Sequence, residues 1–591
     1  MRYWLAPALA ILLLPACASR PTSPSGDGES GEGEGESNTQ GDGADAGNTG
    51  SDSGGHEPHL PVNRDVDILF VIDNSGSMGE EQSNLAKNFS AFIDVLEDPE
   101  VNANYRIAVT TSDNGNPWCG TTSPEAGSLV YSSCLNRLAD FTNVTGTVDA
   151  SNIACADICS LDNGALAIGA GSDPWLENVE GVTNIPDGVT TAEAFRCIGP
   201  QGIAGCGFES QLESMNKALV RTDTQTDPAF GFVRENAILA IVHVTDEADC
   251  SYNNQWASIF EVDGNKVFWH PDSGNSPSSA ICWNAGTACT DNGGGGYDCF
   301  AADYDVDGNL LDPAAPNTIG DAVLHPVSRY VDRVQGIEND KKELNPGQEV
   351  IVALIAGVGS DGQPTYADSP DPVFNKDFGI GAGCAAPVPG SVACTSDADC
   401  AGIGIQVCGP GGYCFEEQTA IPPVRLAAFT DAFTENNKFS ICSDDYSPAL
   451  QAIADAIADQ LRPACFRDCV EDSDPSTPIL DPECVVTERV GTTQTEVSEC
   501  LRGTDGSYVL DPATQSYAMP DDATVVCFAY LVDTGDQSGS PLDDIDPVCT
   551  DDGYNLEFKI ARRPGFPAAA GTSLSAECQL SDTPANDCPN L

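Results

Sequence analysis

Apolar residues along the chain form short continuous runs that alternate with amphipathic stretches. The runs lie at 66–72 (VDILFVI), 105–111 (YRIAVTT), 236–245 (NAILAIVHVT) and 349–358 (EVIVALIAGV). Nearly continuous apolar runs of this length are typical of strands covered on both faces. The pattern therefore predicts a sheet that is buried on both sides.

Three amphipathic stretches between and after these runs predict helices, at about 80–96, 322–334 and 447–461. In the last stretch we expect Ser447 to be the N-cap and Pro448 to occupy the first turn. Strands that alternate with helices indicate an α/β fold. We predict a doubly wound, mostly parallel sheet with helices on both faces.

Three segments between these elements are too long for simple loops: about 112–205, 251–320 and 360–425. They are rich in Gly, Asn, Asp, Pro and Cys, and we interpret them as disulfide-rich insertions. The last one holds a cysteine-rich module at 384–414. From 463 to 591, eight cysteines recur among short β-like runs, which predicts a small, cysteine-rich β domain at the C-terminus.

The first 17 residues have one positive charge, an apolar stretch and small residues before Cys17. This pattern is typical of a secretory signal and is too short for a membrane span. It resembles a bacterial lipobox, in which Cys17 would carry lipid; an ordinary signal peptide is the alternative. Residues 18–62 are rich in Gly, Ser, Glu and Asp and predict a disordered acidic linker. We expect a lipid-anchored protein of the outer membrane, on its periplasmic or surface face.

Composition agrees with export. Acidic residues number 90 against 25 basic ones, a formal charge of −65, so the chain repels phosphate backbones and nucleic acid is not an expected partner. Of the 25 cysteines, 25 − 1 = 24 remain once Cys17 is set aside. In an exported chain an even number predicts disulfides.

Candidate chemistry lies at the ends of two predicted strands. Asp73 follows the first run, in DNSGS, and Ser75 and Ser77 alternate after it. Asp246 directly follows the run at 236–245. If the two strands are parallel, these side chains emerge at one edge of the sheet. Carboxylate and hydroxyl oxygens suit a single divalent cation, Mg²⁺ or Ca²⁺.

Two alternatives stay open. Ser77 and Glu80 have the spacing of a capping box, which would make DNSGS a turn followed by a helix cap. The segment 303–311 (DYDVDGNLL) imitates the start of an EF-hand loop, but its twelfth position is Ala314 instead of glutamate. For 303–311, and for 261–268, which shares the sequence VDGN, we favour hairpins.

The motif Asp73-x-Ser75-x-Ser77, with Thr245-Asp246 after a later strand, resembles the metal-ion-dependent adhesion site of von Willebrand factor type A (VWA) domains. The resemblance covers about residues 63–462 and implies a VWA or Rossmann-like fold. That family has a threonine in a G-x-T stretch as its third element; here Gly207-Phe208-Glu209 places Glu209 at that position. The resemblance implies a metal set of Asp73, Ser75, Ser77, Asp246 and Glu209.

The family resemblance implies recognition of a partner protein that supplies a carboxylate to the metal. We therefore expect a surface lipoprotein that binds a protein through a divalent cation, with the lipid anchor as its only membrane contact. One alternative is a structural envelope protein whose metal site has lapsed or only stabilises the fold. A second is a hydrolase with its site in the insertions. No G-x-S-x-G, H-E-x-x-H or phosphate-binding glycine motif is present, so catalysis is not expected.

Overall fold

The computed structural model describes residues 65–591 with gaps at 99–100, 102, 180, 314–317, 345–347, 401–412, 435, 459, 462–463, 467, 475, 477–478, 491–492, 505, 512–515, 535–540, 552, 564–565, 567–571, 585–587 and 589–591. The expected signal segment, the lipidated Cys17 and the linker lie outside the described residues. Within the described part, none of the helices combines the length and the apolar character that crossing a membrane requires.

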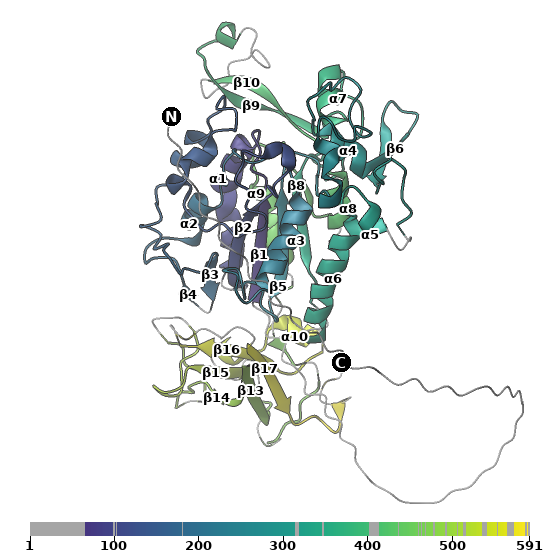
Figure 1. Cartoon of the computed structure of the whole chain (residues 1–591). Coiled ribbons are helices and arrows are strands. Elements are labelled where there is room, and N and C mark those ends of the chain that lie inside the picture. Colours follow the sequence, from purple (N-terminus) through teal and green to yellow (C-terminus); the bar gives the residue numbers. More distant parts are fainter. Residues whose placement is uncertain are drawn as a thin grey trace, which may run out of the picture. The chain divides into compact units, whose positions relative to one another are not determined.

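The chain has a mixed α/β fold built around a seven-stranded sheet (Figure 1). In spatial order the strands are β11 (Lys438–Ser440), β8 (Ile351–Ala356), β5 (Ile238–Val244), β1 (Asp65–Ile72), β2 (Asn104–Thr111), β3 (Leu176–Val179) and β4 (Val182–Thr183). The pairs from β11 to β2 are parallel, whereas β3 and β4 pair antiparallel at one edge. The four apolar runs thus form β1, β2, β5 and β8, as predicted.

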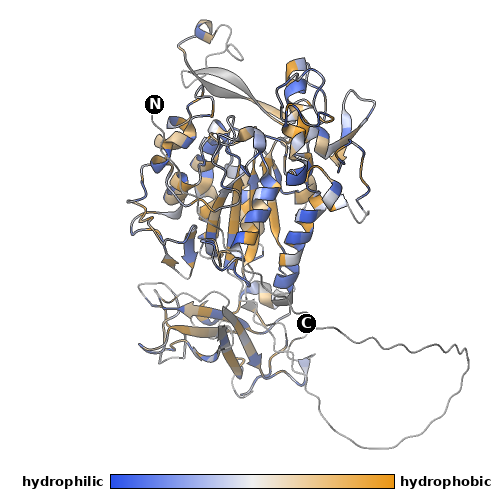
Figure 2. Cartoon of the chain, in the orientation of Figure 1, coloured by the Kyte–Doolittle hydropathy of each residue, from blue (hydrophilic) through white to orange (hydrophobic). Residues whose placement is uncertain are grey.

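Side chains of β1 alternate between two hydrophobic cores, one on each face of the sheet. Phe70 and its even-numbered neighbours pack in the core with α1 (Gly79–Leu96), α2 (Thr191–Ile198) and α9 (Ser447–Ala458). Leu69 and Val71 pack in the core with α3 (Gln211–Thr222), α6 (Val327–Leu344) and α8 (Val424–Thr430). Figure 2 shows the central strands coloured hydrophobic, whereas α6 is largely hydrophilic. Burial on both faces explains the continuous apolar runs.

Two helix predictions need correction. The stretch 322–334 is not one helix: α6 begins at Val327 and runs to Leu344, because a residue before proline, here His325, is disfavoured in helical conformation. Leu324 instead forms an isolated bridge with Tyr252. Ser447 is the first residue of α9 instead of the residue before it, and Pro448 lies in the first turn, as predicted. The Ser447 N–H donates to the Asp445 carboxylate at 2.9 Å, and its hydroxyl donates to Asn88.

The predicted insertions are only partly outside the main fold. The segment 112–205 supplies β3 and β4 to the sheet and α2 to its core. The other two segments hold short helices and hairpins: α4 (Ala280–Gly286), β6 (Thr287–Asp291), β7 (Tyr297–Ala301), α5 (Thr318–Asp321), α7 (Pro372–Phe378), β9 (Cys384–Ala393) and β10 (Tyr413–Ala420). Strands β6 and β7 pair antiparallel, as do β9 and β10.

The EF-hand-like segment 303–311 is a tight turn closed by the bridge between Tyr304 and Leu310, as the hairpin prediction requires. Asp305 accepts hydrogen bonds from within this turn, including one from the Asn309 N–H at 2.8 Å. The hairpin predicted at 261–268 is wrong, because that segment makes a turn without paired strands.

Disulfides are confirmed for every cysteine whose side chain the structure describes. Cys394 and Cys400 are disulfide-bonded, and the remaining bridges are Cys119–Cys206, Cys134–Cys155, Cys159–Cys197, Cys250–Cys282, Cys289–Cys299, Cys384–Cys442, Cys465–Cys549, Cys469–Cys588, Cys484–Cys578 and Cys500–Cys527.

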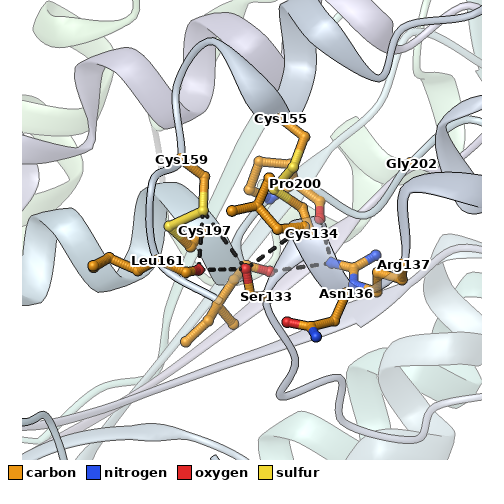
Figure 3. The surroundings of a disulfide bond; sticks show 12 residues. Ser133, Cys134, Asn136, Arg137, Cys155, Cys159, Leu161, Cys197, Pro200 and Gly202 are labelled. Carbon is orange, nitrogen blue, oxygen red and sulfur yellow. Dashed lines mark hydrogen bonds between the residues drawn. A yellow bond between two sulfur atoms is a disulfide. The ribbon is translucent and has the colours of Figure 1, made fainter. Parts of the chain in front are cut away.

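Two of these bridges, Cys134–Cys155 and Cys159–Cys197, organise the segment 112–205 beside Ser133 and Arg137 (Figure 3). Ser133 donates its hydroxyl to the Leu161 carbonyl at 2.6 Å. The guanidinium of Arg137 donates to the carbonyls of Pro200 and Gln201. Side chains thus satisfy backbone groups that no regular element pairs.

The C-terminal residues form a separate six-stranded sheet with its own two small cores. Its strands in spatial order are β12 (Ala464–Cys465), β16 (Glu557–Arg562), β15 (Val526–Leu531), β14 (Thr493–Glu499), β13 (Cys484–Val490) and β17 (Thr572–Cys578). A short helix, α10 (Pro547–Asp551), precedes β16. All eight cysteines of this region are paired with one another.

Candidate metal centre

Three parallel strands end at the same level of the main sheet. Ile72 of β1 is in register with Thr111 of β2 and with Val244 of β5. The residues that follow therefore lie together at the carboxyl edge. The N–H of Asp73 donates to the Val244 carbonyl at 2.9 Å, which fixes the start of the DNSGS loop against β5. Parallel pairing thus brings Asp73 and Asp246 to one edge, as the sequence predicted.

Asp73 is fully buried and its carboxylate is held by hydroxyl and backbone donors. Oδ1 accepts from the Ser75 N–H at 2.8 Å and from the Ser112 hydroxyl at 3.4 Å, and Oδ2 accepts from the Thr245 hydroxyl at 2.5 Å. Gln211 in turn donates to the Thr245 hydroxyl at 2.7 Å. Asp73 is thereby oriented from both neighbouring strands.

The serines of the motif do not cap the following helix. Helix α1 has no side-chain N-cap hydrogen bond, so the capping box of Ser77 and Glu80 does not form. The Ser77 hydroxyl instead lies 3.2 Å from the Ser75 hydroxyl and hydrogen-bonds to the Asp246 carboxylate. The two hydroxyls and Asp246 form one polar group at the strand ends.

Glu209 is brought to the same place by the segment before α3. Its carbonyl accepts from the Cys250 N–H at 2.6 Å, and the next N–H, of Ser210, donates to the Ser112 carbonyl at 3.0 Å. The side chain is only 1% exposed, and neither carboxylate oxygen has a hydrogen-bond partner among the described residues. An ionised carboxylate buried in this way is unfavourable unless something else compensates its charge.

Two further carboxylates, which the sequence analysis missed, face this site. Glu81 in the first turn of α1 is 1% exposed, and both of its carboxylate oxygens lack partners among the described residues. Glu247, next to Asp246, has one such oxygen. In a chain with 90 acidic residues neither glutamate stood out. Ser112, by contrast, directly follows a predicted strand and could have been found by the same reasoning as Asp73.

Burial raises the pKa values of all five carboxylates, and neighbouring negative charges raise those of Glu81, Glu209, Asp246 and Glu247 further. Burial, followed by the negative charge of Asp73, raises the pKa of Asp246 to about 7. Burial raises the pKa of Asp73 as well, against the Thr245 hydrogen bond. The pKa values of Glu81, Glu209 and Glu247 are raised well above the usual range, first by burial and then by neighbouring carboxylates. No Lys or Arg is among the causes of these shifts.

The donor set fits a hard divalent cation. Among the described residues, Asp246 Oδ1 and both carboxylate oxygens of Glu81 and of Glu209 are buried without hydrogen-bond partners. The hydroxyls of Ser75 and Ser77 lie 3.2 Å apart, and that of Ser77 hydrogen-bonds to Asp246. No group of three or more His, Cys, Asp or Glu in the described part of the chain is arranged to hold a metal ion with those side chains alone. That criterion omits hydroxyl oxygens, which Ca²⁺ and Mg²⁺ accept beside carboxylates and water. Unpartnered buried oxygens of this kind are the physical reason to consider a cation here.

His243 of β5 lies near this edge but takes no part in the donor set. It is fully buried with its ring edge-on to Phe429, and neither ring nitrogen has a hydrogen-bond partner among the described residues. Burial lowers the pKa of His243 to about 3, so the ring is neutral at ordinary pH.

Comparisons with known proteins add little. No protein-family model matches the sequence, and no curated protein matches it. Among solved structures, the pilus adhesin SpaC from Lactobacillus rhamnosus GG, in its open conformation, aligns at 9% identity over 88% of this chain and 39% of that one, with a TM-score of 0.24. The pilus adhesin RrgA from Streptococcus pneumoniae aligns at 9% identity over 88% and 57%, with a TM-score of 0.22. The chain thus spans less than two thirds of either adhesin, and TM-scores this low do not establish a shared fold.

Proposed function

We propose that residues 63–462 form a VWA-like domain that binds a divalent cation through Asp73, Ser75, Ser77, Asp246 and Glu209, and that the protein recognises a partner protein through this site. The observation that carries the proposal is the group of buried carboxylates at the carboxyl edge of β1 and β5 with no cationic partner among the described residues. A bound Mg²⁺ or Ca²⁺ would offset their charge.

The strand order supports the VWA-like assignment. β1 and β5 are neighbours in the parallel part of the sheet. From β1 the chain continues to β2 on one side of it, and it later returns to form β5 on the other side, so the strand order reverses between β1 and β5. In open α/β sheets, ligands bind at the edge where strand order reverses in this way. Asp73 and Asp246 follow these two central strands. The position of the acids and the topology of the sheet therefore favour the same edge.

When bound, the cation supplies positive charge that can hold an oxygen of a partner protein. This chain's residues do the rest: Thr245 and Ser112 orient Asp73, and the backbone bonds of Glu209 fix its side chain against the strand ends. Several carboxylates around one ion leave it little residual positive charge. The excess of negative carboxylate charge over the charge of the cation favours a second candidate function, in which the metal only stabilises an envelope protein.

Capture of partners from envelope extracts distinguishes the two functions. The oxidised protein is used as bait with Ca²⁺, with Mg²⁺ and with chelator, beside the variants Asp73→Ala and Asp246→Ala. For recognition, we expect partners that bind only with metal and only to the wild type. If metal raises thermal stability but the captured proteins are the same with chelator and in both variants, the metal has a structural role only. We further propose lipid anchoring at Cys17 in the outer membrane; loss of lipid labelling in Cys17→Ser tests this.

A further inference from the structure

We infer that the partner recognised at the carboxyl edge carries its acidic residue beside apolar side chains, and that these pack on the exposed side chains of Val144 and Val148 next to the DNSGS loop. The inference rests on the proposed function and names the chemistry of the partner. It follows from where the candidate metal centre reaches solvent and from what lies beside that place.

The candidate metal centre reaches solvent through the DNSGS loop. Four of the five residues proposed to bind the cation are buried, whereas Ser77 is exposed, together with Gly76 before it. A group of the partner that binds the cation therefore comes to lie next to Gly76 and Ser77.

A turn of the segment 112–205 lies directly beside this exposed part of the loop. A Cβ atom built on Gly76 would lie 3.7 Å from the Cβ atom of Asn143. Asn143 begins the turn, and its N–H donates to the Val148 carbonyl at 3.0 Å. A partner segment that lies over Gly76 and Ser77 is therefore next to residues 143–148.

This turn presents apolar side chains to solvent. Val144 is 59% exposed and Val148 is 47% exposed. Residues 141–148 (FTNVTGTV) contain no charged side chain, although 19% of the chain is Asp, Glu, Lys or Arg. Exposed apolar side chains that gather beside a binding site are typical of protein interaction surfaces. An uncharged surface also does not repel an acidic partner, whereas most of a chain with a formal charge of −65 does.

The turn is held in shape by its own hydrogen bonds and by a disulfide. The side-chain oxygen of Asn143 accepts from the N–H groups of Thr147 and Val148 at 2.9 and 3.2 Å. Phe141, at the start of the turn, is fully buried, and the bridge Cys134–Cys155 holds the segment on both sides of it (Figure 3). A surface that is already ordered loses little conformational entropy when a partner binds.

The chemistry of the partner follows from these two neighbouring features. The cation attracts a carboxylate oxygen. The valine side chains gain free energy when they leave water, and they do so against an apolar group. Because Asn143 contacts the loop at Gly76, one short segment of the partner reaches both. We therefore assign to the partner an Asp or Glu flanked by residues such as Leu, Ile or Phe.

Selection from a library of random short peptides tests this chemistry directly. The oxidised full chain is immobilised, peptides are bound in Ca²⁺, and chelator releases them. We expect the released peptides to contain Asp or Glu beside an apolar residue far more often than the unselected library. The affinity of the most enriched peptide should fall about fivefold in each of Val144→Ser and Val148→Ser, because half-exposed valines lose their contact with it.

The matched control is Val220→Ser, which changes a valine that is 46% exposed near the end of α3. It should bind the peptide as the wild type does. Calorimetric titration should give the same Ca²⁺ affinity for the wild type and all three variants. Equal Ca²⁺ affinity shows that the valines contact the partner and do not act by holding the metal site in shape.

Acidic peptides without apolar neighbours, or equal peptide affinity in the wild type and both turn variants, overturn this inference and leave metal-dependent recognition standing. Peptides that stay bound in chelator, or the absence of any peptide bound in Ca²⁺, contradict the proposed recognition and the inference with it. A wild-type dimer in sedimentation that dissociates in Val144→Ser shows that a second copy of this chain covers the turn, which also overturns the inference.

Discussion

Replacing Glu209 by glutamine should stabilise the protein without metal and destabilise it relative to the wild type with metal. Glu209 is buried, and no described residue donates a hydrogen bond to its carboxylate. In chelator the folded chain must keep this charge buried or take up a proton. Glutamine has nearly the same shape, carries no charge, and can donate its amide N–H to a neighbouring carboxylate. The substitution therefore removes the cost of burying the Glu209 carboxylate, which lowers the free energy of unfolding only when no metal is bound.

The size of the effect follows from ordinary magnitudes. An unsatisfied buried polar group costs about 1–3 kcal/mol, and more when it is charged. For a domain of about 400 residues, 1 kcal/mol shifts the melting temperature by about 1 °C. We expect Glu209→Gln to melt about 1–3 °C above the wild type in chelator. Ligand at about 100 times its Kd adds about 2.7 kcal/mol to the wild type. A variant with weaker affinity gains less, so the order of the two melting temperatures should invert.

Differential scanning calorimetry of the oxidised protein, with chelator and with Ca²⁺, measures both temperatures. Asp94→Asn removes the same charge from the exposed face of α1 and should show no inversion. If Glu209→Gln lowers the melting temperature by equal amounts in chelator and in Ca²⁺, Glu209 contributes to packing and does not face a cation.

Two other predictions concern the framework of the site. Replacing Cys119 and Cys206 by serine should weaken Ca²⁺ affinity by about tenfold, or ~1.4 kcal/mol. The reason is that Cys206 lies three residues before Glu209, and its N–H donates to Asp113 at 3.2 Å, so the bridge holds the segment that positions Glu209. The same change at Cys289–Cys299, in the β6–β7 hairpin, should leave affinity unchanged; equal losses in calorimetric titrations would refute this role. For His243, burial lowers the pKa to about 3 in the folded state, so only the unfolded chain takes up this proton as pH falls below about 6.5. The stability present above that pH is therefore lost progressively as the pH falls toward 3. Between pH 6.5 and 5 the free energy of unfolding of the wild type should fall by about 2 kcal/mol more than that of His243→Leu. Urea unfolding in chelator measures both, and identical losses in the two proteins would contradict this.

The sequence was sufficient for the central strands because burial on both faces leaves continuous apolar runs. It was sufficient for Asp73 and Asp246 because parallel strands place their next residues at one edge. The edge strands β3 and β4 were not predicted, because LENV and VT are too short and too polar to show a period. The start of α6 was misplaced because the apolar residues before Pro326 pack without being helical.

The missed site residues have a different cause. Glu81 reaches the site because α1 begins immediately after the DNSGS loop, and its position is that of an ordinary acidic residue in a first helical turn. Glu247 differs from its many acidic neighbours only in lying next to Asp246. Their contribution depends on how the helix and loops close over the strand ends, which no local pattern records.

Calorimetric titration of the oxidised protein with Ca²⁺ and Mg²⁺ tests the central claim most directly. The account predicts saturable binding by the wild type and its loss in Asp73→Ala and Asp246→Ala, both still folded by near-ultraviolet circular dichroism. Absence of saturable binding to the wild type, or binding that survives both substitutions unchanged, would contradict a cation site at the ends of β1 and β5.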